Sequence, residues 1–132
     1  MAADFHSKHS IVAHRKEELY MSFTDMRIFL LMLPEDKKQG VTADFDHIKA
    51  TVQGFTIGLK VQDRIPYSTL VLQDDDAPFH FTISFHFDDA PQPGYTDFHI
   101  DVSADLNLVM RKMVGGKIQE ALDKIADSLS MQ

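Results

Sequence analysis

Seven histidines are the residues of this sequence with the most evident capacity for chemistry. His80, His86 and His99 alternate with apolar residues, so their side chains are expected on the polar face of a sheet, together with Asp97 and Asp101. If the two segments pair across the turn between them, His86 comes near Asp97 or His99. Two imidazoles and one carboxylate form a ligand set suited to transition-metal ions. Spacing along a strand does not fix a coordination sphere, so we prefer a solvated outer face and expect neither metal ion nor cofactor.

Residues for acid–base catalysis are few. His6, His9 and His14 lie on the first predicted strand, whose register the sequence leaves open. An inward-facing His9 would be the best candidate for a general base. Tyr67 and Tyr95 are the other residues that a catalytic cavity could use. No catalytic residue is assigned on this basis.

Familiar functional motifs are missing from the sequence. Residues 74–76 form an aspartate triplet, but the spacing and the distal glutamate of a calcium-binding loop are absent, so we interpret the triplet as a polar turn. Neither a glycine-rich phosphate loop nor a Gly-x-Ser-x-Gly elbow is present. The absence of cysteine excludes thiol catalysis, thiolate zinc sites and disulfides.

The composition indicates one ordinary domain, assigned to residues 1–132. A chain of 132 residues with 44% hydrophobic and 25% charged residues is near the globular average. Its net charge of −7 argues against a nucleic-acid partner, because phosphate backbones are bound by clustered basic residues. The sequence shows no secretory signal and no apolar run long enough to span a bilayer. We therefore expect a cytoplasmic protein without a transmembrane segment.

The first half of the chain predicts a strand followed by two short helices. A strand is expected over residues 4–14, and apolar residues recur at helical spacing over residues 19–33. Asp25 is expected to cap the second helix, and Pro34 to stop it. The polar stretch 35–40 reads as a turn.

The second half predicts about five antiparallel strands and one long helix. Period-two alternation marks strands over residues 48–53, 57–62, 67–73, 79–87 and 97–104. Asp105 is a plausible N-cap for an amphipathic helix of about 25 residues, in which Gly115 and Gly116 predict a kink or a tight approach to the sheet. The predicted fold is α+β, with a curved antiparallel sheet wrapped around the terminal helix.

The order of elements and several stretches of sequence resemble a known superfamily. These stretches are residues 33–35, 45–59, 61–66 and 104–127, the last beginning Ala-Asp-Leu-Asn-Leu-Val-Met-Arg-Lys-Met. They resemble small bacterial members of the START-like superfamily. It is also called SRPBCC or helix-grip, and it takes in the polyketide-cyclase-like proteins and the birch-pollen-allergen fold.

The resemblance implies a cavity between the curved sheet and the terminal helix. Apolar side chains of both would either fill that space as core or line a pocket for a hydrophobic ligand such as a lipid or isoprenoid. The residues expected to bind such a ligand are Leu59, Val61, Phe81, Ile83, Phe85, Phe98, Ile100, Met110, Met113 and Ile118.

Three functions remain open at this stage. Non-enzymatic ligand binding is the first choice. The alternatives are a polyketide cyclase or dehydratase, and a protein-interaction module such as the START-like activators of chaperone ATPases. An edge strand, either the first or residues 67–73, could also pair two subunits as a homodimer.

Overall fold

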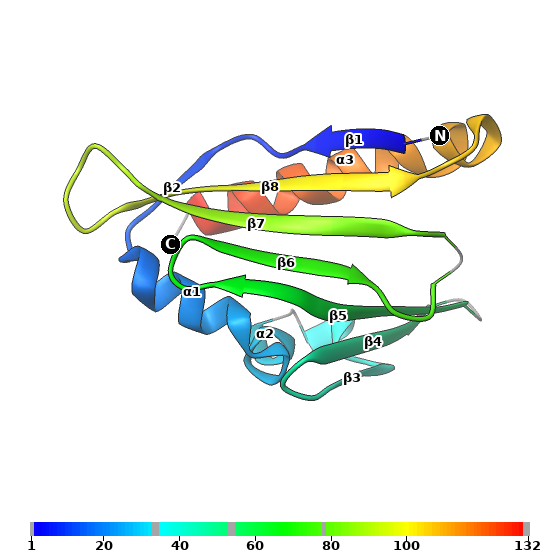
Figure 1. Cartoon of the computed structure of the whole chain (residues 1–132), viewed down its shortest axis with the longest axis horizontal. Coiled ribbons are helices and arrows are strands. Elements are labelled where there is room, and N and C mark those ends of the chain that lie inside the picture. The colour runs from blue at the N-terminus through cyan, green and yellow to red at the C-terminus, as the bar shows by residue number, and fades with distance from the viewer. Residues whose placement is uncertain (1, 33–34, 53–54, 78, 131–132) are drawn as a thin grey trace.

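A single antiparallel sheet forms the wall of the molecule, and one long helix lies across its concave face (Figure 1). The structure is a computed structural model that describes residues 2–32, 35–52, 55–77 and 79–130. Within these residues the sheet has eight strands in the order β1-β8-β7-β6-β5-β4-β3, and β2 also pairs with β8. This is the predicted α+β fold, with the predicted curved sheet and terminal helix.

The bounds of the elements agree with most of the sequence predictions. The strands are β1 (Ala2–His6), β2 (Ser10–Val12), β3 (Val41–Ala43), β4 (His47–Val52), β5 (Phe55–Ile65), β6 (Thr69–Asp74), β7 (Phe81–Asp89) and β8 (Thr96–Asp105). The helices are α1 (Lys16–Thr24), α2 (Met26–Met32), the one-turn 3-10 helix η1 (Glu35–Lys37) and α3 (Leu108–Ser130). None of the described helices is long and apolar enough to cross a bilayer.

Four predictions about these elements need correction. The single first strand is two strands, broken where the backbone N–H of Ser7 donates to Ile100 and the hydroxyl oxygen of Ser7 accepts from the Ile100 N–H. β3 follows a stretch in which only a turn was predicted, because three residues are too few to show an alternation. β6 is an interior strand, so residues 67–73 do not offer a free edge, whereas β1 does lie at an edge.

The fourth correction concerns the start of α3. Its N-cap is Asn107 rather than Asp105, since the Asn107 side chain accepts the Met110 N–H at 2.8 Å. Asp105 is the last residue of β8. The cap of α2 is as predicted, because Asp25 accepts the Arg27 N–H at 3.0 Å. Pro34 lies outside the described residues.

The glycine pair leaves α3 continuous, without the predicted kink, and only Gly115 lies in contact with the sheet, at ordinary van der Waals distance. Gly115 is buried, and a Cβ added there would lie 3.6 Å from the ring of Phe5 on β1. A Cβ on Gly116 would meet open space. The helix therefore approaches the sheet at Gly115 without a break at either glycine.

Polar contacts fasten α3 to the edge of the sheet formed by β1 and β2. The buried hydroxyl of Ser10 donates to the Ala126 carbonyl at 2.6 Å, and the Gln119 side chain donates to the His6 carbonyl at 2.7 Å. Lys8 and Asp127 form an ion pair at 2.6 Å. The helix is thus held against β1, β2 and β8, and β5 to β7 continue the concave face beyond it.

Candidate functional site

The inner face of the sheet is apolar along its whole width, and its burial changes from one end to the other. At the end covered by α1 the side chains are almost fully buried, as at Phe87, Phe98 and Leu70, and Phe23 of α1 packs between the rings. At the other end several apolar side chains are only partly buried, although neighbours such as Leu72 and Val102 are buried. This half-covered set, which we call the inner-face site, comprises Leu59, Val61, Phe81 and Ile83 on the sheet and Met110, Val114 and Ile118 on α3.

Six of the ten predicted ligand residues belong to this inner-face site. Phe85, Phe98 and Ile100 instead lie in the buried part of the same face. Met113 is a correction, because 67% of it is exposed. A helix returns to the same face after three to four residues, and α3 turns Val114, four residues after Met110, towards the core in place of Met113.

The buried polar side chains near the core have hydrogen-bond partners within the fold. Ser10 is bonded to Ala126 as described, and the Thr96 hydroxyl donates to the His14 carbonyl at 2.6 Å. Thr24 accepts a 2.8 Å hydrogen bond from Arg64. Such hydrogen bonds satisfy buried polar groups, and they give these side chains structural roles.

The three residues considered for catalysis lie away from the inner-face site. His9 is on the outer face, where it pairs with Asp97. Tyr67 is at the turn between β5 and β6, where its ring meets Tyr20 edge-on at the α1 end of the core. Tyr95 is in the loop before β8. The structure therefore brings none of them together.

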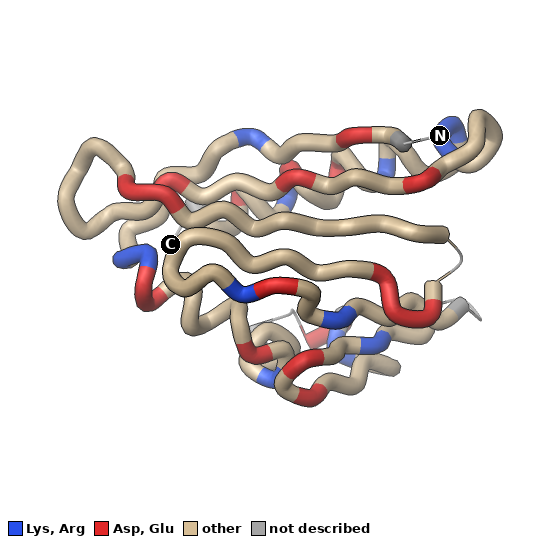
Figure 2. Tube along the Cα trace, viewed as in Figure 1, with Lys and Arg blue, Asp and Glu red and all other residues tan. Residues whose placement is uncertain are grey.

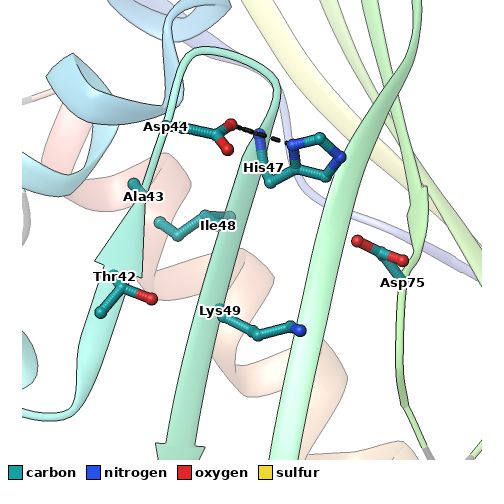
Figure 3. A pocket seen from close by; sticks show the side chains of 7 residues that line it. All are labelled: Thr42, Ala43, Asp44, His47, Ile48, Lys49 and Asp75. Carbon is teal, nitrogen blue, oxygen red and sulfur yellow. Dashed lines mark hydrogen bonds and ion pairs between the residues drawn. The ribbon is translucent and has the colours of Figure 1, made fainter.

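Two shallow hollows open on other parts of the surface. The larger, about 350 Å³, lies by the turn between β3 and β4, and the His47 imidazole there is 2.9 Å from Asp44 (Figure 3). The His47 hydrogen bond holds the pKa of the Asp44 carboxyl below its usual value. The smaller, about 230 Å³, lies at the ends of β6, β7 and β8 beside Asp74 and His80. Neither hollow lies between the sheet and α3.

The aspartate triplet is a turn, as predicted. Asp74 ends β6, and the Asp75 N–H donates to the carbonyl of Gly58 on β5 at 2.9 Å. The triplet is visible as the acidic bend at one end of the sheet (Figure 2).

The outer face carries a second group of polar side chains, which we call the outer-face cluster. It comprises His6, His9, His86, His99, Asp97 and Asp101. β7 and β8 place His86 directly opposite His99, which confirms one of the two predicted pairings, while Asp97 lies opposite Asp88. The rings of His9, His99 and His86 form a stack across the strands, with centroids 4.3 and 4.5 Å apart.

Asp101 and His99 are the electrostatic centre of the outer-face cluster. Burial raises the pKa of the Asp101 carboxyl, but the hydrogen bond from His6 and the charges of His86, His99 and His6 outweigh it, so the pKa is below its usual value. Burial, and then the neighbouring His86 and His9, lower the pKa of His99. Asp101 is therefore held as a carboxylate and His99 as a neutral imidazole near pH 7.

Solved structures with the same architecture cover nearly the whole chain. Norcoclaurine synthase from Thalictrum flavum superposes with a TM-score of 0.72 at 14% identity, covering 98% of this chain and 92% of that one. Mll3558 from Rhizobium loti gives 0.64 at 12% identity, with 98% of each chain covered. The Aha1 dimer from Colwellia psychrerythraea gives 0.61 at 14% identity, covering 97% of this chain and 96% of that one.

The chain has the helix-grip fold that these solved structures share. The likeness is one of fold, since no family model and no curated protein matches the sequence. The predicted resemblance to helix-grip proteins is thereby confirmed at the level of architecture.

Two features of this helix-grip domain escaped the sequence analysis. Val114 was missed, although its spacing of four from both Met110 and Ile118 is a signal that could have found it. The sequence analysis did not place His6 and His9 beside His99. Their positions opposite β8 depend on the break at Ser7, and alternation of residue types does not reveal that break.

Proposed function

We propose that this helix-grip domain binds a hydrophobic small molecule at the inner-face site, between β5, β7 and the first half of α3. The observation that supports the proposal is the partial exposure of seven apolar side chains on facing surfaces of one sheet and one helix. Bringing such surfaces out of water is favourable by about 25 cal/mol per Å². A bound apolar molecule would complete the burial that α3 leaves incomplete.

The placement of α3 supports an opening at this end of the sheet. Its second half is tied to β2 through Ser10, and Leu122 and Ala126 there are buried. In its first half Met110, Val114 and Ile118 pack against the core but are only partly buried. A ligand could thus enter while the second half of the helix stays anchored.

The chemistry of the surroundings supports binding rather than catalysis. The buried hydroxyls of Ser10 and Thr96 are bonded to backbone carbonyls, and His9 lies on the opposite face of the sheet. A norcoclaurine synthase mutant of the same fold was solved in complex with a transition-state analogue. At 15% identity, that complex gives precedent for a ligand in this fold and none for its identity.

A protein-interaction role is the second candidate. Leu108, Val109 and Met113 form an exposed apolar strip on the first turns of α3, each about two-thirds exposed. Apolar residues gathered on a surface are a common feature of interaction sites. The fold shared with the Aha1 dimer is compatible with this role.

Two substitutions one residue apart separate these functions. In Val114→Trp the indole would occupy the inner-face site, whereas in Met113→Trp it would point to solvent. We expect Val114→Trp to weaken binding of the apolar dye 1-anilinonaphthalene-8-sulfonate and of a fatty-acid panel at least tenfold, with Met113→Trp close to wild type. Fluorescence titration and native mass spectrometry measure the affinities.

The outcome depends on both variants being folded, which their melting curves establish. Equal binding by the wild type and Val114→Trp would refute the ligand site. Weaker binding only in Met113→Trp would show that the dye and the fatty acids contact the exposed strip of α3, and it would favour the interaction role.

A further inference from the structure

The outer-face cluster is remote from the inner-face site, because its side chains project from the other side of β7 and β8. His86 and His99 alternate along their strands with the buried residues Phe85, Phe87 and Phe98. Any function of the cluster is therefore separate from the proposed ligand site, and its test does not depend on that proposal.

We propose that His86, His99 and Asp101 bind a divalent first-row transition-metal ion. Their ligand atoms all lie within 4.8 Å of one another. Asp101 Oδ2 is 3.0 Å from His86 Nε2 and 3.8 Å from His99 Nε2. Ligand atoms bonded to one tetrahedral zinc ion at 2.0–2.1 Å are about 3.3 Å from each other, so the two spacings from Asp101 Oδ2 are close to that value.

His6 positions the carboxylate for this role. Its Nδ1 lies 2.7 Å from Asp101 Oδ1, which leaves Oδ2 directed towards the two imidazoles. Groups that hold a metal-binding side chain through its second polar atom are a regular part of metal sites. The bond to His6 also fastens β1 to the cluster, so three strands meet at the site.

Metal binding requires a change in the histidine stack, because the His99 ring lies between the rings of His9 and His86. The rings of His86 and His99 are stacked at an angle of only 14°, whereas a metal ion lies in the plane of each imidazole that binds it. At least one ring must therefore turn. His99 Nδ1 is buried and has no hydrogen-bond partner within the described part of the chain, so no such bond opposes the rotation. Orphaned buried nitrogens of this kind are uncommon in folded proteins.

A neighbouring set, His9, Asp97 and His99, is the other arrangement that satisfies the distances. We favour the set with His86 because all three of its residues are partly buried, whereas 60% of the His9 side chain is exposed. Shielding from water strengthens the interaction of charged ligands with a cation. The two sets share His99, and only one of them contains His86.

The donor types indicate which ions should bind. Imidazole nitrogen with one carboxylate suits Zn²⁺, Co²⁺, Ni²⁺ and Fe²⁺, whereas Mg²⁺ and Ca²⁺ prefer all-oxygen sites. Zn²⁺ is thus the probe for affinity. Co²⁺ is the probe for geometry, because its visible absorption reports the coordination number.

The experiment uses the chain of 132 residues without an affinity tag, titrated with Zn²⁺ by calorimetry and with Co²⁺ by absorption. We expect one ion per chain and a rise in melting temperature at saturating Zn²⁺ that equal Mg²⁺ does not produce. His86→Gln and Asp101→Asn should each weaken Zn²⁺ binding at least tenfold. Imidazole nitrogen NMR shifts of His86 and His99 should change on binding.

His80→Gln is the matched control. His80, the residue before β7, is also paired with an aspartate, 2.9 Å from Asp74, but it stands outside the cluster. Its loss should leave Zn²⁺ affinity unchanged.

Three results would overturn the proposal, with circular dichroism verifying that each variant is folded. The first is wild-type binding no tighter than that of His86→Gln. The second is an equal loss of affinity in His80→Gln, which would reveal nonspecific histidine binding. The third is a loss in His9→Gln without one in His86→Gln, which would assign the metal to the neighbouring set.

Discussion

Asp74 shows how a single carboxylate joins two strands of this sheet. Its Oδ1 accepts the Phe81 N–H at 2.8 Å, and its Oδ2 lies 2.9 Å from His80 Nδ1. The Phe81 hydrogen bond is the largest influence on the Asp74 pKa, which it lowers, and His80 adds to the effect against an opposing contribution from burial. The carboxylate is therefore stabilised in the folded state.

This lowered pKa makes stability depend on pH in a defined direction. An unfolded aspartate has a pKa of about 3.9, so the folded state gains stability from Asp74 above that value and loses it as the pH falls through the lower folded pKa. Asp74→Asn should cost about 1 kcal/mol of unfolding free energy at pH 7. The cost should shrink near pH 3.

Urea unfolding at pH 7 and pH 3 measures this difference, with Asp63→Asn as the control because Asp63 is exposed on β5. His80 loses its partner in Asp74→Asn, so the interaction of His80 with the carboxylate is part of the measured cost. A cost that is the same at both pH values would contradict the role assigned to the carboxylate.

Individual residues also show what the sequence could and could not predict. Alternation along two strands was enough to bring His86 opposite His99. It could not bring His6 to Asp101, because that contact depends on the pairing of β1 with β8, far apart in the chain. Met113 was wrongly assigned to the inner face because the apolar stripe of α3 was extended by one position.

Two glycines differ in whether the structure leaves room for a side chain. Gly58 lies in β5 where the turn after β6 folds against it, and a Cβ there would stand 1.8 Å from the Asp75 carbonyl oxygen. Gly116 lies in α3, and a Cβ added there would have no atom outside the local helix backbone within 4 Å. The first glycine permits a close backbone approach, whereas the second only weakens a helix.

The same substitution at the two glycines should therefore have opposite effects. Gly58→Ala must displace backbone and should destabilise the fold by more than about 2 kcal/mol. Gly116→Ala should stabilise it by about 0.5–1 kcal/mol, because alanine favours helix. Thermal or urea unfolding of the two variants beside the wild type measures both, and a stabilised Gly58→Ala would contradict the backbone packing described.

Element types were largely predictable, and the exceptions have a common cause. Long segments such as β7 and α3 carry enough repeats of their period to be recognised, and both formed as predicted. β3 has three residues, and the first strand is interrupted at Ser7. Such short segments are specified by their partners in the sheet rather than by their own pattern.

At the scale of the whole molecule, the two faces of the sheet carry different chemistry. The inner face is apolar. It is covered by α1 at one end and by α3 along one edge. Between β5, β7 and the first half of α3, several of its apolar side chains are only partly buried. The outer face gathers imidazoles and carboxylates where β1, β8 and β7 meet. The sheet separates the proposed ligand site from the proposed metal site.

The order of elements was enough to predict the architecture. It was not enough to predict how much of the inner face of the sheet α3 covers. One long helix with an apolar stripe predicts that it packs on the sheet, but where it is fastened depends on Ser10, Gln119 and Lys8, which no periodicity reveals. Those contacts decide which apolar residues stay partly exposed. They therefore decide where the proposed ligand site lies.

Methyl NMR of the full chain during titration with a saturated fatty acid tests the ligand site most directly. The account predicts that the methyl signals of Ile83 and Ile118, in the inner-face site, shift with a common saturation curve. Those of Ile11 and Ile28, which are exposed elsewhere, should stay in place. Shifts confined to Ile11 and Ile28, or to the exposed strip of Leu108 and Val109, would contradict it.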